Sequence, residues 1–197
     1  MATDRVAFIP WNRAQAGNFI KEYEDNNSGG THNNRKWTIV CLDTPGKPLA
    51  DIGFGFGTRI HVAGHGSIGC KAIGADHGTN GADVSVEDLV KAMFEQGLKK
   101  RYIGTIACDV CYSALGNPSF AKQLARELWA KGVKASCVLG YKGPMVATYN
   151  NELKGTLGGN KNHKYTHRIV DVEFDANGDP TKSVKSKYAQ ARFVGWD

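Results

Sequence analysis

A histidine and a cysteine each follow directly after an apolar run of this chain. The first run ends in Ala63-Gly64-His65-Gly66, and the second ends in Ile106-Ala107-Cys108. An imidazole beside a thiol can act as the base for a nucleophile, because the thiolate is the form that attacks. The two residue types therefore predict nucleophilic catalysis, provided that the fold brings His65 and Cys108 together.

One amphipathic helix is expected between these two runs. Ser85 and Asp88 form a capping box at its start, apolar residues follow at helical spacing, and Gly97 ends it. Two parallel strands that are joined by such a crossover lie side by side, with their carboxyl ends at the same edge of the sheet. We therefore expect His65 and Cys108 to meet at that edge, and we expect the amides of Gly66 and Cys108 to hold a developing oxyanion.

The rest of the pattern predicts an α/β fold, a mainly parallel sheet with helices on both faces. From Arg5 to Tyr141 the expected order is strand, helix, strand, strand, helix, strand, helix, strand. Asn12 is expected to cap the first helix, and Asn117-Pro118 is expected to start the last one. We expect a single domain over 1–197, with its core at about 5–141 and a C-terminal β-hairpin or flap at about 164–194.

Composition agrees with an ordinary globular chain. Of the 197 residues, 41% are hydrophobic and 22% are charged. No segment reaches the roughly 20 apolar residues that cross a bilayer, and the N-terminus does not resemble a secretion signal. The five cysteines have no regular spacing, which favours free thiols in a reducing compartment. We expect a cytoplasmic protein, or one that a bacterium delivers by a signal-less route.

The order of these motifs resembles the caspase-like (clan CD) cysteine peptidases, and most of all the protease domains of bacterial toxins and effectors. The phrases HVAGHG and TIAC match the two motifs of that group, and SFAKQLARELWAKG is similar to the helix that follows its cysteine. The resemblance covers about Arg5 to Tyr141. It implies an endopeptidase that cleaves protein or peptide substrates through a thioester acyl-enzyme.

The resemblance also implies roles for individual residues. His65 would be the general base and acid, Cys108 would be the nucleophile, and Asp43 is the candidate for an acid that orients the histidine. Cys111 is an alternative nucleophile, because Cys111-Tyr112-Ser113 also fits the bacterial pattern of a cysteine followed by small polar residues.

Other functions are compatible with the same residues. Cys108-x-x-Cys111 is also typical of thiol-redox sites and, together with histidines, of zinc sites. Zinc binding is disfavoured because His61 and His65 would lie about 13 Å apart along a strand. A third alternative is a caspase-like module that binds without catalysis.

Substrate and activator preferences give weaker signals. A pocket for a basic side chain would need a buried acid, and Asp109 is closest to the proposed nucleophile, whereas Asp76 and Asp83 lie on the loop after His65. The net charge of +6 predicts attraction of anions rather than a fold. Nucleic acid is not expected as a partner, since the chain has no RNA-binding motif or zinc finger. By resemblance to the toxin branch, inositol hexakisphosphate is a candidate activator, and its candidate anion-binding residues are Lys161, Lys164, Arg168, Lys182 and Lys185.

Overall fold

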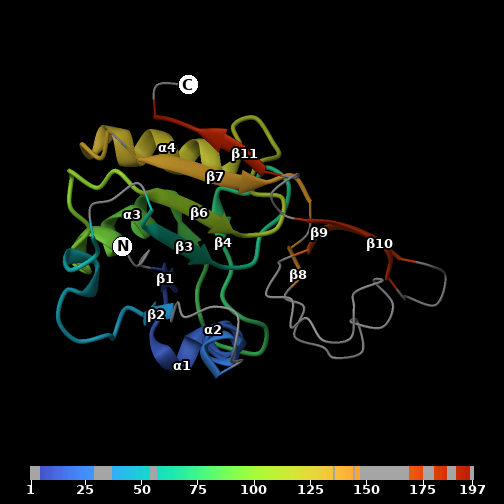
Figure 1. Cartoon of the computed structure of the whole chain (residues 1–197), viewed down its shortest axis with the longest axis horizontal. Helices are drawn as coiled ribbons and strands as arrows, with labels where there is room; N and C mark the ends of the chain where they lie inside the picture. The colour runs from blue at the N-terminus through green and yellow to red at the C-terminus, as the bar shows by residue number, and fades with distance from the viewer. Residues whose placement is uncertain are drawn as a thin grey trace.

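The computed structural model shows an α/β protein built around one six-stranded sheet (Figure 1). It describes residues 5–28, 37–53, 57–134, 136–143, 145–146, 169–174, 180–185 and 190–195. The strands are β1 (Arg5–Phe8), β2 (Trp37–Val40), β3 (Arg59–Ala63), β4 (Ala72–Ile73), β5 (Val84–Ser85), β6 (Thr105–Asp109), β7 (Cys137–Tyr141), β8 (Met145–Val146), β9 (Ile169–Phe174), β10 (Pro180–Lys185) and β11 (Gln190–Phe193). The helices are α1 (Arg13–Ala16), α2 (Asn18–Ser28), a 3-10 turn (Pro48–Ala50), α3 (Val86–Glu95) and α4 (Phe120–Ala130).

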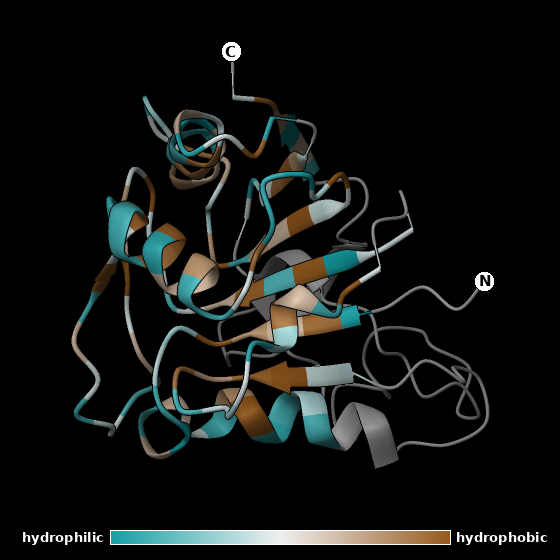
Figure 2. Ribbon diagram, turned by 90° about the vertical axis from the view of Figure 1, so that its left-hand side faces the viewer, coloured by the Kyte–Doolittle hydropathy of each residue, from teal (hydrophilic) through white to brown (hydrophobic). Residues whose placement is uncertain are grey.

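The main sheet has the strand order β11-β7-β6-β3-β1-β2, and all of its neighbours pair in parallel except β11 with β7. Its inner strands are apolar and almost fully buried, as expected where helices cover both faces of a parallel sheet. Figure 2 shows these strands as brown bands between helices that carry more of the hydrophilic teal. The predicted fold class is therefore confirmed at the level of a mainly parallel α/β sheet.

Helix α2 covers one face of the sheet and α4 covers the other. The hydroxyl of Tyr23 in α2 reaches the carboxylate of Asp109 at the end of β6. On the opposite face, a Cβ added to Gly140 of β7 would lie only 2.7 Å from Cβ of Ala121 in α4. Side chains alternate between faces along a strand, so Asp109 and its neighbour Cys108 point to opposite layers.

The first predicted helix is divided in two at Gly17. Asn12 caps α1 as expected, since its side-chain oxygen accepts the amide of Gln15 at 2.9 Å. Gly17 then has a φ of 51°, a conformation that interrupts a right-handed helix. A Cβ at Gly17 would also collide with the carboxylate of Asp76, so this break makes room for a residue from a distant loop.

The two later helices begin at serine caps. Ser85 accepts the amide of Asp88 at 3.1 Å and donates to the Asp88 carboxylate at 2.8 Å, which confirms the predicted capping box of α3. The expected start of α4 at Pro118 is wrong by two residues. Ser119 is its N-cap and Phe120 its first residue, while Pro118 lies in the preceding turn.

A C-terminal hairpin is present within the predicted span of about 164–194. Strands β9 and β10 pair antiparallel, and β8 adds a third strand to this small sheet. The chain then returns to the core, because β11 pairs antiparallel with β7 over Gln190–Phe193. The predicted core boundary near residue 141 is therefore too early, since residues 190–193 form one edge of the main sheet.

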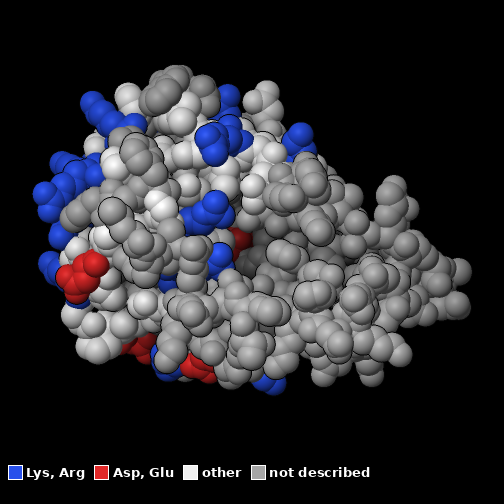
Figure 3. Space-filling model, viewed as in Figure 1, with Lys and Arg blue, Asp and Glu red and all other residues white. Residues whose placement is uncertain are grey.

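The surface of the described part carries charges of both signs. In the space-filling view, blue Lys and Arg side chains are scattered over the described face, with red Asp and Glu side chains among them (Figure 3). Among the helices that the structure describes, none combines the length and apolar character needed to cross a bilayer.

Candidate functional site

The carboxyl ends of β3 and β6 lie side by side, as the sequence predicted. Val62 pairs with Cys108 and Ala63 pairs with Asp109 in the parallel register. Beyond these pairs, the turn after β3 packs directly on the turn after β6. A Cβ added to Gly66 would collide with Val110 and lie 3.1 Å from the carbonyl oxygen of Cys111. The backbone next to His65 thus lies close to that of Cys111, and a residue with a side chain would be crowded at Gly66.

The segment after His65 is fixed to its surroundings at several points. Its base is closed by His65 and Gly74, whose backbones bond to each other in both directions. Near its middle, the amide of Gly69 donates to the carbonyl of Leu115 at 3.0 Å, and Gly116 packs against Gly69. These contacts connect the loop after β3 to the loop after β6.

The ring of His65 lies on the α2 face of the sheet. It packs against Phe19 of α2 with the ring centroids 5.1 Å apart, and His77 stacks on it at 4.2 Å. The side chain is 38% exposed, yet its Nε2 atom is buried and makes no hydrogen bond to any residue that the structure describes. One edge of the imidazole therefore faces the protein, while the ring as a whole keeps access to solvent.

The pKa of His65 is lowered below its usual value. Burial of the ring has the largest effect, His77 adds to it, and Asp76 opposes both. A lowered pKa leaves the imidazole neutral at neutral pH, which is the state that a general base requires.

The acid beside His65 is Asp76 and not Asp43. An Asp76 carboxylate oxygen lies 3.6 Å from His65 Nε2, and the other accepts the amide of Asn18 at 2.7 Å. Asp43 is exposed and accepts the amide of Arg13 at 2.9 Å, at the start of α1. The contact that the structure gives the Asp43 carboxylate is with the start of α1, and the acid that it places next to His65 is Asp76.

Cys108 does not share a face with His65. It is fully buried and points away from the layer that holds Asp109 and α2. Burial raises the pKa of its thiol far above the usual range, so the reactive thiolate is suppressed. Its amide also lies inside a strand with neighbours on both sides, where amides serve strand pairing. Its burial and its place on the opposite face therefore weigh against both the nucleophile and the oxyanion role expected for Cys108.

Cys111 is placed differently, in the turn that follows β6. It is half-buried, and its carbonyl lies against Gly66. The next residue, Tyr112, has a φ of 55°, which is unusual for a residue with a side chain. Such backbone strain is held only where the surroundings determine it, and it is concentrated at functional sites. Here the Tyr112 amide donates to Gly143 at 3.0 Å.

Asp109 is part of a buried polar cluster beneath α2. Its carboxylate accepts the hydroxyl of Tyr23 at 3.0 Å and Nδ1 of His61 at 2.8 Å. The His61 ring in turn packs edge-on against Trp37 at 4.7 Å. The Asp109 side chain is only 1% exposed, so it holds α2 on the sheet rather than facing a substrate.

The candidate anion-binding residues lie only partly in the region that the structure describes. Lys182 and Lys185 lie on β10, whereas Lys161, Lys164 and Arg168 lie outside the described residues.

Cys108 and Cys111 do not stand at a helix start as a redox pair would, because α4 begins only at Phe120. In the part of the chain that the structure describes, no three His, Cys, Asp or Glu side chains converge on a metal position.

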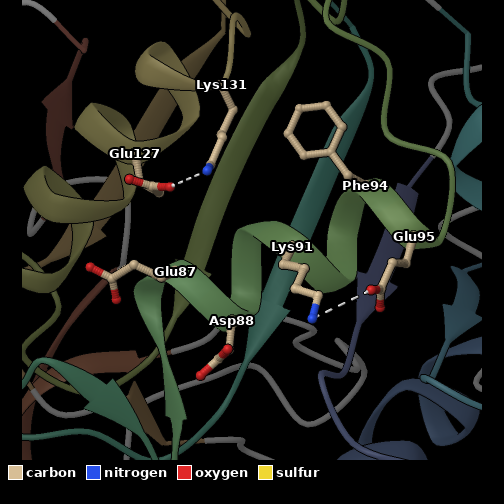
Figure 4. A pocket seen from close by; sticks show the side chains of 7 residues that line it. All are labelled: Glu87, Asp88, Lys91, Phe94, Glu95, Glu127 and Lys131. Atoms are coloured by element: carbon tan, nitrogen blue, oxygen red, sulfur yellow. Dashed lines mark ion pairs between the residues drawn. The ribbon is translucent and has the colours of Figure 1, made fainter.

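A shallow groove lies elsewhere, between α3 and α4. Figure 4 shows its lining side chains, in which Lys91 pairs with Glu95 at 4.0 Å and Lys131 pairs with Glu127 at 3.5 Å. The groove contains none of the candidate catalytic residues. It is lined by Glu87, Asp88, Lys91, Phe94, Glu95, Glu127 and Lys131.

Comparison with known proteins adds no assignment: no family model matches the chain, and no curated protein matches it significantly. The site therefore stands on its own geometry. Sequence reasoning placed Asp76 only among the acids of a possible substrate pocket. Its contact with His65 depends on how the glycine-rich loop folds back, which residue spacing does not reveal.

Proposed function

We propose that this protein is a cysteine endopeptidase in which His65 is the base and Cys111 the nucleophile. The observation that carries the proposal is the close approach of Gly66 to the turn that contains Cys111, at the ends of two adjacent parallel strands: a Cβ on Gly66 would lie 3.1 Å from the carbonyl oxygen of Cys111. Gly66 directly follows His65, whose imidazole is neutral, and it lies close to Cys111, which is half-buried. The resemblance of HVAGHG and of the residues around Cys111 to caspase-like peptidases supports the same reaction.

The reaction follows from the chemistry of these groups. His65 accepts the proton of the Cys111 thiol, and the thiolate attacks the carbonyl carbon of the scissile peptide bond. The amide of Gly66, together with that of Cys111, stabilises the oxyanion that forms. The imidazolium then gives its proton to the departing amine as the C–N bond breaks, which leaves a thioester. Water, deprotonated by the neutral imidazole, hydrolyses the thioester and restores the thiol.

Cys111 takes the nucleophilic role because its environment differs from that of Cys108. A nucleophile must reach a substrate, and Cys111 is partly exposed whereas Cys108 has no exposed surface. It must also form a thiolate, which the burial of Cys108 opposes. Cys111 follows the strand end, where ligands of parallel sheets bind.

A panel of peptidyl electrophiles that differ in the residue before the scissile position tests the proposal. We expect at least one of them to modify the folded protein, with the adduct on the peptide that contains Cys111. Cys111→Ala should abolish both labelling and turnover, with a loss of about 10³-fold or more in kcat. His65→Ala should reduce turnover by a similar factor.

Cys108→Ala is the matched control, since it removes a thiol three residues away. It should keep labelling and activity per folded molecule, although it leaves a small cavity. An adduct on Cys108 would overturn the assignment of the nucleophile. A folded protein that no probe modifies and that cleaves no peptide would instead support a binding module without catalysis.

A further inference from the structure

Asp76 occupies a position between His65 and the first turn of α2. One carboxylate oxygen accepts the backbone amide of Asn18, the first residue of α2, and the other lies 3.6 Å from Nε2 of His65. The Asp76 side chain is 9% exposed. The free amides and the positive end of the helix dipole attract a carboxylate to a helix start.

The position of Asp76 is fixed by its neighbours as well. Gly17 has no side chain where the Asp76 carboxylate lies, and a Cβ there would collide with it. The Asp76 carbonyl accepts both the amide and the hydroxyl of Thr79, at 3.2 and 2.8 Å. The carboxylate is therefore held by the backbone of α2 on one side and by its own turn on the other.

His65 presents an unsatisfied atom to this carboxylate. Nε2 is buried and makes no hydrogen bond to the residues that the structure describes, and an Asp76 carboxylate oxygen lies 3.6 Å from it. This distance is just beyond a direct hydrogen bond. A buried ring nitrogen next to an anionic acceptor is favoured as N–H, which leaves the lone pair on the other nitrogen.

We propose that Asp76 is the positioning residue of His65, holding Nε2 as the N–H so that Nδ1 takes the proton from Cys111. This inference rests on the proposed function for its kinetic consequences, but the tautomer itself does not. Asp76 and Gly17 thereby couple the base to the start of α2. Phe19 of α2 and His77 also pack against the same ring.

The ionisable groups that act on His65 define the expected pH behaviour. Asp76 favours the charged imidazolium, whereas burial and His77 favour the neutral ring. Phe19, contributed by α2, is uncharged. Removal of the Asp76 carboxylate should therefore lower the pKa of His65 further, and the acid limb of kcat/KM should shift to lower pH. A substitution that only loosened the fold would not produce this shift.

Nitrogen NMR of the histidine rings in the full chain tests the tautomer directly. The His65 signals are assigned by their loss in His65→Ala. At pH 7.5 we expect His65 in the Nε2–H form, and in Asp76→Ala we expect a mixture of both tautomers with a lower pKa. The kinetic expectation is a loss of about 10- to 100-fold in kcat with little change in KM, the pattern of a misdirected base.

Two further variants keep the test decisive. Asp83→Ala removes an exposed acid from the same loop and should change neither the His65 signals nor turnover. Asp76→Asn preserves the shape and one oxygen acceptor, so it should fold even if Asp76→Ala does not, and it should still lower the pKa of His65. An unchanged tautomer and pKa in a folded Asp76 variant would overturn the proposal.

The same data separate this inference from the proposed function. If the wild-type protein cleaves no peptide but His65 changes its tautomer and pKa as expected, the peptidase fails and the positioning role stands. If turnover depends on Cys111 but the His65 signals do not change in the Asp76 variants, the proposed peptidase function is supported and the positioning role of Asp76 is excluded.

Discussion

The backbones of His65 and Gly74 exchange two hydrogen bonds of 2.9 Å each. This pair extends β3 by one bridge beyond Ala63, and it closes the base of the loop that contains Cys70. The position of the His65 backbone is therefore set by the strand and by the loop together. His65 is thereby held where its side chain lies beside Asp76.

Replacing Gly66 by alanine should separate the two strand ends. The new methyl group would collide with Val110 and crowd the carbonyl of Cys111 and the thiol of Cys70. We expect a loss of about 1–3 kcal/mol in the free energy of unfolding, which is typical of overpacking. Any folded Gly66→Ala protein should also lose most of its turnover. Urea titration and steady-state kinetics measure the two effects.

Gly74→Ala is the control for that experiment. A Cβ there would meet Asp83 at 3.4 Å and His65 at 3.7 Å, which are ordinary contacts. It should fold with nearly unchanged stability. Equal losses for both glycine variants would mean that the contact between Gly66 and the turn after β6 has no special importance.

The five thiols should react in two classes. Cys70, Cys111 and Cys137 are half-buried, whereas Cys41 and Cys108 are buried. Iodoacetamide added to the native protein should modify only the half-buried thiols. After unfolding in urea, it should modify all five. Peptide mapping by mass spectrometry identifies the sites. Rapid native labelling of Cys108 would contradict the burial on which the choice of Cys111 depends.

The cluster of Tyr23, His61 and Asp109 should matter for stability. Asp109→Ala leaves the partners of a buried carboxylate unsatisfied, and we expect about 3–5 kcal/mol of destabilisation. Tyr23→Phe removes one buried hydrogen bond and should cost about 1–2 kcal/mol. Asp43→Ala, which removes an exposed helix cap, serves as the comparison and should cost about 1 kcal/mol or less. Urea unfolding ranks the three variants, and an Asp109 variant as stable as the Asp43 variant would exclude this structural role.

Activity should persist into mildly acidic solution. Because the pKa of His65 lies below 6.5, the neutral base is retained as the pH falls through 6.5 and is lost only below that value. Stability should change in the same range. The unfolded chain binds a proton at His65 near pH 6.5 and the folded protein does not, so folding weakens as the pH falls from there towards the pKa of the folded state. A profile of kcat/KM against pH with an acid limb above 6.5 would contradict this expectation.

At alkaline pH, the stability of the folded protein should fall as the pH rises, which is the opposite direction to the change near pH 6.5. Burial raises the pKa of Cys41 from 9.0 to about 11. Above pH 9 the unfolded chain releases this proton and the folded chain does not, so stability falls as the pH rises from 9 to 11. Thermal unfolding between pH 8 and 11 measures the decline. Cys41→Ala should make the decline shallower, and an unchanged slope would show that Cys41 does not cause it.

The fold was predictable to the extent that its signals were local. Apolar runs marked β3 and β6, and Ser85 with Asp88 marked the start of α3, because these depend on residues close together in sequence. The interruption at Gly17 was not predictable, since it depends on Asp76 from a loop far along the chain. The return of β11 to the main sheet depends in the same way on long-range pairing with β7.

The edge of the sheet that holds the candidate site was predictable, but the side chains that form the site were not. The sequence placed His65 and a cysteine at one end of the sheet, and β3 and β6 do pair in parallel. It favoured Cys108 as the nucleophile and kept Cys111 as the alternative, because the residue at which the strand ends cannot be read from the residue types alone. Since β6 extends to Asp109, Cys108 turns inward, and the position beyond the sheet falls to Cys111.

The hydroxyl of Ser113 has a consequence for how wide this end of the sheet can open. It donates to the carbonyl of Cys108 at 3.2 Å and accepts the amide of Tyr141 at 3.0 Å, so one side-chain oxygen stands where a peptide group would otherwise join β6 to β7. The hydroxyl of Ser113 thus bridges the two strands where they separate. Replacing Ser113 by alanine would leave a gap between β6 and β7, which a water molecule or a closer approach of the two strands must fill. The separation of the two strands at this end therefore depends on the single oxygen of Ser113.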